Sequence, residues 1–299
     1  WPWLALAVAQ LVSLPVYLWN ARHGFASFVY QSAGRATESR LDLGDALGFL
    51  GSQVLLLLPV PLFAFLWAAG RHSWRLARRA EAVEPATLFL LSFSVPVFAT
   101  CAVLSTVTWV KINWAMPAYV AGLVLAAGAL GRRAVRWHLA TAVVLHAVLA
   151  VQLVAYPVPL TSDDTWFGWR ALAREVEARA ERYPGAFVFS ADNYKTTAEL
   201  RFYSDLEVYG MNVLGWNALH YGYLGEDVAA LAGRDALYIR SEEGLAPSRK
   251  SERYLERTRR HFGGVRELEP IRIEHRGRLV RLFRVFHCEG YRGPEPGGG

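Results

Sequence analysis

The sequence contains very few cysteines. Among its 299 residues there are two, Cys101 and Cys288. Cys101 lies in an apolar run, whereas Cys288 lies in the polar half of the chain, so we do not expect them to pair. Two cysteines also supply no zinc-type ligand spacing. The sequence therefore predicts neither a disulfide framework nor a structural zinc module.

The sequence also lacks the short motifs of nucleotide and hydrolase chemistry. It has no G-x-x-x-x-G-K-[ST] loop, no G-x-G-x-x-G ahead of a helix, no G-x-S-x-G elbow and no H-E-x-x-H. Nucleotide-sugar chemistry in the cytoplasm is therefore not supported.

Charge and apolar residues divide the chain into two halves. Residues 1–156 consist mainly of strings of Leu, Val, Ala and Phe, with 11 Lys and Arg against 5 Asp and Glu. Residues 157–299 resemble a soluble domain and carry 21 of each charge. The whole basic excess belongs to the apolar half, and the soluble half has no basic patch, so we expect no nucleic-acid partner.

The apolar half predicts a polytopic helical membrane domain. The first run lacks a charged flank and a cleavage site, so it is not a signal peptide. We expect it to continue a helix that begins upstream of Trp1. The predicted spans are 1–18, 46–69, 86–108, 115–130 and 138–156.

Arginines suggest the orientation of these spans. Loops 70–86 and 131–137 together hold seven Arg, whereas 19–45 and 109–114 hold three Arg and one Lys. The positive-inside rule places the Arg-rich loops in the cytoplasm. The other loops and the C-terminal domain are then periplasmic or extracellular, at the inner (plasma) membrane of a bacterium.

The polar half alternates helix and strand patterns, which predicts a small α/β domain over 157–292. We expect a long loop over 210–224 and a disordered tail over 293–299. The predicted helices are 166–183, 194–203 and 250–261, the strands 186–190, 207–209 and 235–240, and a closing hairpin joins 265–274 to 278–287.

Two polar segments on the predicted outer face combine cations, amides and aromatic rings. The first is Trp19–Arg35 and the second follows the third span at Lys111–Trp114. Such segments suit a lipid-linked phosphate, but an aromatic belt with snorkelling cations has the same composition. The candidate phosphate or donor ligands are Lys111, Arg22, Arg35, His23, Asn20, Gln31 and Asn113.

These segments resemble a known family. Residues 15–31 are similar to a P-x-x-x-W-N-x-x-H-x-x-x-S-F-x-x-Q segment of bacterial membrane glycosyltransferases of the protein O-mannosyltransferase and aminoarabinose transferase type, which have the GT-C fold. Residues 51–59 resemble that family's G-Q-x-x-x-x-x-P span, 111–119 its K-x-N-W-x-x-P-A-Y turn, and 194–203 its Y-x-x-A-x-x-L-x-F-Y helix. The ordered set is more specific than any one piece.

The resemblance implies a function. Members take a sugar from a polyprenyl-phosphate-linked donor and transfer it, with inversion, to a lipid, glycan or protein acceptor on the outer face. An acidic residue activates the acceptor or assists a divalent metal, and it lies in the first outer loop, which we expect upstream of Trp1. The carboxylates near the predicted outer face are Glu38, Asp42 and Asp45, and helix capping or solvation explains them more simply.

Each candidate ligand also has a structural explanation. Lys111 is expected to neutralise the lipid phosphate, with Arg22 or Arg35 assisting through a planar fork; each could instead anchor a helix at the interface. His23 could orient a phosphate oxygen or cap a loop. The amides of Asn20, Gln31 and Asn113 could bond sugar hydroxyls or tie loops together, and Gln53 is expected to join helices.

The soluble half offers two further candidate regions. The first could frame an acceptor site or simply cap a helix, and comprises Asp192, Asn193, Tyr194, Lys195 and Glu199. The second has a composition typical of sugar contacts but could equally pack onto the membrane half, and comprises Trp216, Asn217, His220, Tyr221 and Tyr223.

Two other classes of protein remain as alternatives. A transporter or lipid flippase would place polar or ionisable residues at mid-membrane, and these spans carry almost none. A non-catalytic, membrane-anchored binding protein would need no upstream loop.

Overall fold

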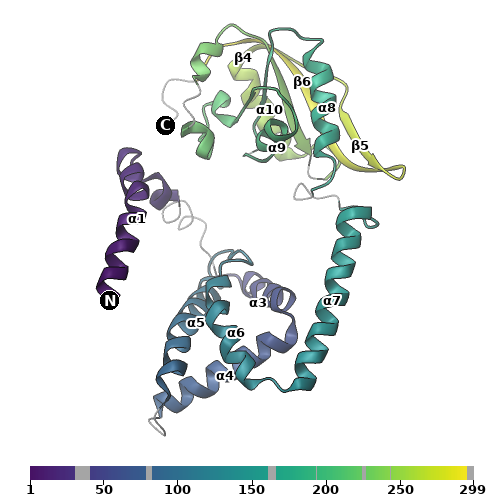
Figure 1. Ribbon diagram of the computed structural model, residues 1–299. Coiled ribbons are helices and arrows are strands. Elements are labelled where there is room, and N and C mark those ends of the chain that lie inside the picture. Colours follow the sequence, from purple (N-terminus) through teal and green to yellow (C-terminus); the bar gives the residue numbers. More distant parts are fainter. Residues whose placement is uncertain are drawn as a thin grey trace. The chain divides into compact units, whose positions relative to one another are not determined.

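The chain forms two compact units. The computed structural model describes residues 1–30, 41–78, 83–160, 166–192, 194–223, 227–242 and 244–294. Trp1–Val151 form a helical unit and Gln152–Gly299 a unit built on a sheet (Figure 1). Each unit is described by itself.

The helical unit is less regular than the predicted row of five spans. Three helices, α1, α5 and α7, are long and apolar enough to cross a membrane, and α3 with α4 would make a fourth if the bent pair is one span. Helix α6 has 14 residues, a length of about 21 Å against the roughly 30 Å of a bilayer core. The number of spans is therefore not confirmed. The helices are α1 (Pro2–Arg22), α3 (Leu43–Leu57), α4 (Pro59–Ala77), α5 (Pro85–Leu104), α6 (Met116–Ala129) and α7 (Arg132–Ala155).

The predicted span over 46–69 is not one continuous helix. The chain breaks at Leu58, where φ is 63° and ψ is 158°, and α3 and α4 meet at 113°. Pro59 explains the break, because it has no N–H to donate and disfavours a helical conformation in the residue before it.

The Arg-rich connections are shorter than predicted. Helix α4 continues through Arg71 and Arg75 to Ala77, and α7 already begins at Arg132. Likewise α1 extends to Arg22 instead of ending at residue 18. Hydropathy marks where apolar residues stop, but a helix can continue beyond that point because arginine is a good helix former.

Helices α3 to α6 pack around aromatic rings. The Phe65 ring meets the rings of Phe98 and Tyr119 nearly edge-on, at 5.6 and 6.1 Å between centroids. Phe49 adds a fourth ring, 6.2 Å from Phe98. Gly122 on α6 allows the close approach of α4, because a Cβ there would lie 2.8 Å from the Phe65 ring.

The second unit confirms a small sheet-containing domain after the membrane helices. Its strands run in the order β2-β1-β3-β6-β4, and β5 also pairs with β6. Strands β2, β1 and β3 are parallel, whereas β6 is antiparallel to its neighbours. The elements are α8 (Trp169–Ala180), β1 (Phe187–Ser190), α9 (Lys195–Tyr203), β2 (Val208–Tyr209), η1 (Met211–Leu214), η2 (Leu219–Tyr223), η3 (Val228–Leu231), β3 (Ala236–Glu242), α10 (Arg249–His261), β4 (Phe262–Glu267), β5 (Ile271–His275) and β6 (Arg278–Tyr291).

Successive residues of β3 bury opposite faces of this sheet. Leu237 and Ile239 belong to the core with Leu172 of α8. Tyr238 belongs to a second core with Leu255 of α10. The alternation follows from the two-residue period of a strand and places helices on both faces (Figure 1).

The closing hairpin is confirmed only in part. Strands β5 and β6 do form a hairpin around Arg276 and Gly277. The predicted strand 265–274 is wrong, because it divides into β4 and β5, which pair with different parts of β6. Pro270 lies between them and has no N–H for a ladder hydrogen bond.

Candidate donor-phosphate site

A buried hydrogen bond joins two segments of the helical unit that are distant in sequence. The Tyr119 hydroxyl of α6 donates to Gln53 Oε1 of α3 over 2.6 Å. Gln53 is fully buried, and its Nε2 donates to the carbonyl oxygens of Phe49 at 3.3 Å and Ile112 at 3.4 Å. The prediction that Gln53 joins helices agrees with this geometry, which also attaches the turn after α5 to α3.

The turn itself is tight and presents its polar side chains outward. The Trp114 N–H donates to the Lys111 carbonyl over 3.0 Å, and the Met116 N–H to the Asn113 carbonyl over 3.2 Å. The side chains of Lys111 and Asn113 are exposed. Backbone bonds and Gln53 therefore hold the turn, which leaves the ammonium and the amide available to a ligand.

The N-terminus of α3 lies beside the same connection. The Asp42 N–H donates to the Thr106 carbonyl over 2.9 Å. The Asp42 carboxylate caps α3 by accepting from the N–H groups of Gly44 at 2.8 Å and Asp45 at 3.4 Å. Asp42 thus acts as a helix cap, as its simpler explanation predicts.

Short-range hydrogen bonds and one ring stack hold the C-terminal end of α1. Asn20 is 1% exposed; its Nδ2 donates to the Val16 carbonyl and its Oδ1 accepts from the Ser27 N–H, both at 3.0 Å. The His23 ring stacks on Trp19 at 4.3 Å, with Nδ1 2.7 Å from the Trp19 carbonyl oxygen.

These contacts explain why W-N-x-x-H-x-x-x-S forms a unit: Asn20 and His23 close the helix and direct the chain into the next turn. Arg22 on this segment is exposed. Gln31, Arg35 and Glu38 lie outside the described residues. That this segment shares a membrane face with Lys111 stays a prediction.

In the soluble unit, Asp192 is held beside the start of α9. Its carboxylate accepts from the Ser190 hydroxyl at 2.7 Å and from the Thr196 hydroxyl. Burial raises the pKa of the Glu199 carboxyl, and nearby Arg281 and Lys195 oppose that shift. Asn193 lies outside the described residues, and at the helix start Tyr194 is exposed and Lys195 is half-buried.

The predicted loop 210–224 contains two short 3-10 turns, η1 and η2. Tyr221 is buried and its ring lies 4.2 Å from the His220 ring. Trp216 packs at 4.6 Å against Tyr254 of α10, so this side of the loop packs onto its own domain.

Within the described parts of the chain, no group of three or more His, Cys, Asp or Glu side chains is placed to hold a metal ion. Sequence reasoning missed Tyr119 as the partner of Gln53, although both belong to matched motifs. It also missed three arginines of α10, whose signal is their spacing: Arg253, Arg257 and Arg260.

Comparison with known proteins gives one informative relative. Lipid A galacturonosyltransferase RgtD of Rhizobium johnstonii is 34% identical over 125 residues, which is 41% of this chain and 25% of the relative. The match thus spans about a quarter of that relative. No family model matches the chain, and no solved structure matches it. The similarity supports a glycosyltransferase family, and the membrane helices agree with it.

Proposed function

We propose that the chain is part of a glycosyltransferase that moves a sugar from a polyprenyl-phosphate-linked donor to an acceptor at the outer face of the bacterial inner membrane. The observation that carries the proposal is the buried Tyr119–Gln53 hydrogen bond of 2.6 Å. It joins two of the motifs that resemble the glycosyltransferase family and holds the turn that carries Lys111. The similarity to a lipid A galacturonosyltransferase supports the same class of reaction.

The reaction breaks the bond between the sugar C1 and the phosphate oxygen, and the electron pair stays on the phosphate. The acceptor oxygen bonds to C1, and its proton leaves to a base that we assign to no residue of this chain. Negative charge therefore grows on the lipid phosphate, and the exposed Lys111 ammonium is the group we expect to offset it. Arg22 and Arg35 are the assisting cations, and a divalent metal is the other possible source of charge.

The remaining candidate residues have supporting roles in the proposed reaction. His23 and Asn20 hold the end of α1 through their local contacts, so they would place Arg22 near the donor. Asn113 and Gln31 are proposed to contact sugar hydroxyls. The resemblance to aminoarabinose transferases proposes one sugar, whereas galacturonic acid with lipid A is the first pair to test because the Rhizobium relative is named for it.

The test is Lys111→Ala in the complete membrane enzyme, supplied with a polyprenyl-phosphate-linked sugar and lipid A. We expect the transfer rate to fall about 100-fold, the effect of removing one group that stabilises transition-state charge. Lys111→Arg should recover part of it. The matched control is Arg136→Ala, an exposed cation on α7, which should change neither rate nor donor affinity. Unchanged rate and donor affinity in Lys111→Ala would refute the proposal.

A further inference from the structure

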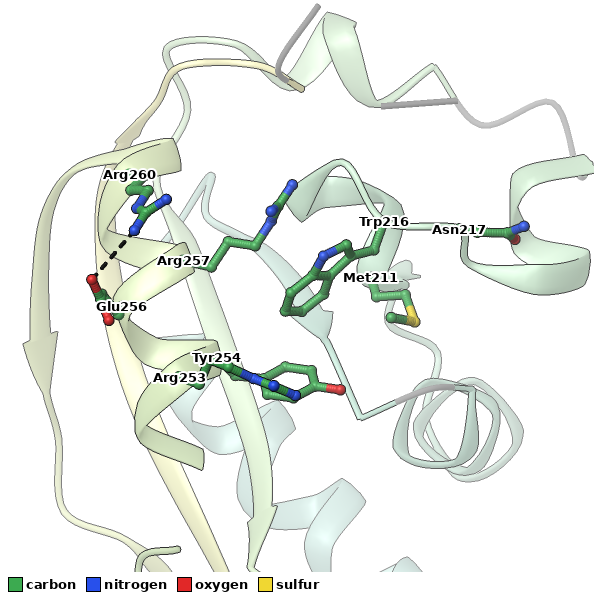
Figure 2. Close-up of a pocket in the computed structure, with 8 residues that line it drawn as sticks. All are labelled: Met211, Trp216, Asn217, Arg253, Tyr254, Glu256, Arg257 and Arg260. Carbon is green, nitrogen blue, oxygen red and sulfur yellow. Dashed lines mark hydrogen bonds and ion pairs between the residues drawn. The ribbon is translucent and has the colours of Figure 1, made fainter. Parts of the chain in front are cut away.

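The soluble unit has a pocket between α10 and the segment after η1. Its volume is about 590 Å³, within the range of small-molecule sites. Figure 2 shows the side chains that line it. One wall comes from α10 and the other from the 210–224 segment, and the lining residues are Met211, Trp216, Asn217, Arg253, Tyr254, Glu256, Arg257 and Arg260.

An arginine and two aromatic rings hold the two walls together. The Arg257 Nε donates to the Leu214 carbonyl over 2.8 Å, and its guanidinium lies 4.8 Å from the centre of the Trp216 ring. Trp216 in turn meets Tyr254 edge-on at 4.6 Å. Figure 2 shows Arg257 reaching from α10 toward Trp216. The indole is thereby fixed at the pocket with part of its surface exposed.

The pocket is strongly cationic. Its lining carries three arginines against one glutamate, and that glutamate, Glu256, pairs with Arg260 at 3.3 Å. Arg253 is exposed and makes no hydrogen bond or ion pair with another residue of the described ranges. At least one guanidinium is therefore free to meet an anion.

A fourth arginine lies behind the aromatic wall. The Arg240 guanidinium of β3 is 4.4 Å from the centre of the Tyr254 ring, and the side chain is only 2% exposed. Its Nε and Nη1 are buried without a hydrogen-bond partner among the described residues. The neighbouring Glu242 carboxylate partly offsets this cation, so the arginines that line the pocket supply most of its positive charge.

We propose that this pocket binds the anionic saccharide headgroup of the acceptor, with an arginine fork on its phosphate or carboxylate and the Trp216 indole against a sugar ring. Guanidinium matches the geometry of phosphate and carboxylate oxygens, and the flat indole offers an apolar face to the C–H side of a pyranose. Assigning the saccharide to the acceptor, not to the donor, rests on the proposed glycosyl transfer.

The binding test uses the full chain in detergent and small soluble probes. Saturation-transfer NMR would follow the protons of glucosamine 1-phosphate and of glucosamine, and inorganic phosphate would be measured by its competition with glucosamine 1-phosphate. We expect glucosamine 1-phosphate to bind about ten-fold more tightly than either fragment, because only it engages both the arginines and the indole. Arg253→Gln with Arg260→Gln should weaken its binding about ten-fold or more. Arg259→Gln is the matched control, since Arg259 lies on the same helix but does not line the pocket.

A kinetic test identifies the source of the saccharide. In the complete enzyme the double variant should raise KM for the acceptor and leave KM for the polyprenyl-phosphate donor unchanged. A raised donor KM instead would overturn the assignment to the acceptor. Equal affinity for inorganic phosphate and glucosamine 1-phosphate would show that the pocket recognises only the anion. That result would overturn the proposal that it binds a saccharide.

The experiments distinguish failure of the pocket proposal from failure of the proposed glycosyl transfer. If glucosamine 1-phosphate binds as expected but the complete enzyme transfers no sugar, the proposed function fails and the pocket stands. If transfer proceeds with unchanged KM values in the double variant and no probe binds, the pocket is refuted while the proposed function stands.

Discussion

Arg284 of β6 joins three carboxylates on the α10 face of the sheet, and removing it should destabilise the soluble unit strongly. Its guanidinium contacts Glu267 at 2.7 Å and Glu252 at 2.6 Å, and lies 3.9 Å from Glu242. The hydrogen bonds from Arg284 lower the pKa of Glu267. Burial raises the pKa of Glu242, and the Ser251 hydrogen bond and the neighbouring arginines oppose that rise.

The cost of Arg284→Met follows from how exposed each partner is. The Glu267 and Glu252 side chains are 47% and 54% exposed, so water can replace the arginine there, whereas the Glu242 side chain is 0% exposed. Breaking a buried ion pair costs about 3–5 kcal/mol, and we expect the lower end because Glu242 alone is fully buried and keeps its interactions with Ser251 and Arg240. A loss of about 3 kcal/mol corresponds to about 150-fold more frequent opening of the domain.

Cys288 supplies the assay. It is 0% exposed in the core of the sheet, and burial raises the pKa of its thiol, so a maleimide should reach it only when the domain opens. Cys101→Ala removes the other thiol. We expect Arg284→Met to label about 150-fold faster than the parent, and the exposed control Arg266→Met within about three-fold of it. Labelling of Arg284→Met at the parent rate would refute the reasoning.

The pH dependence isolates the role of Glu242. A carboxyl whose pKa is raised on folding costs stability as pH rises from its unfolded pKa through its folded one. Without Arg284 that pKa rises further, so the deficit of Arg284→Met should be largest near about pH 8 and smaller near about pH 5.5, where Glu242 holds its proton longer. The maleimide labelling rate at each pH is divided by the rate for the unfolded protein at the same pH, because thiol reactivity itself depends on pH. Adding Glu242→Gln should recover part of the deficit at the higher pH; no recovery would show that Glu242 is not the stranded charge.

Two further predictions concern packing of the membrane helices, measured by thermal unfolding in detergent. Tyr119→Phe leaves Gln53 Oε1 buried without its donor and should cost about 1–2 kcal/mol, and its effect should be less than additive with Gln53→Leu; simple additivity would contradict the coupling. Gly122→Ala places a methyl group 2.8 Å from the Phe65 ring and should cost about 1–3 kcal/mol, whereas Gly128→Ala on the same helix meets nothing within 4 Å and should not destabilise. Phe65→Leu should remove most of the penalty of Gly122→Ala, and a penalty that persists would place the clash elsewhere.

The elements that the sequence predicts well are those with their own periodicity and caps. Helices α8, α9 and α10 and strands β1, β2 and β3 lie where the patterns place them, within a few residues at the ends. Their burial stripes are set by local spacing, so one stretch of sequence contains the whole signal.

The break at Leu58 and the split between β4 and β5 show where hydropathy misleads. Apolar residues continue through Leu58, and over 265–274 apolar residues recur between charged ones, so only Pro59 and Pro270 mark the change. A proline acts on the hydrogen bonding and on the preceding residue without altering apolar character. The signal in both places is a proline in the backbone, which the pattern of apolar residues does not reveal.

The candidate sites differ in how far apart in the sequence their contacting residues lie. The amide of Asn20 and the cap at Asp42 are satisfied within a few residues of sequence, so local reasoning could anticipate them. The pocket required two distant segments: the arginines of α10 have the spacing of an ordinary solvated helix face, and Trp216 belongs to a loop far upstream. Only when Arg257 binds the Leu214 carbonyl does that charged face gain a second wall, and the arginines that water would otherwise solvate then line one ligand-sized space.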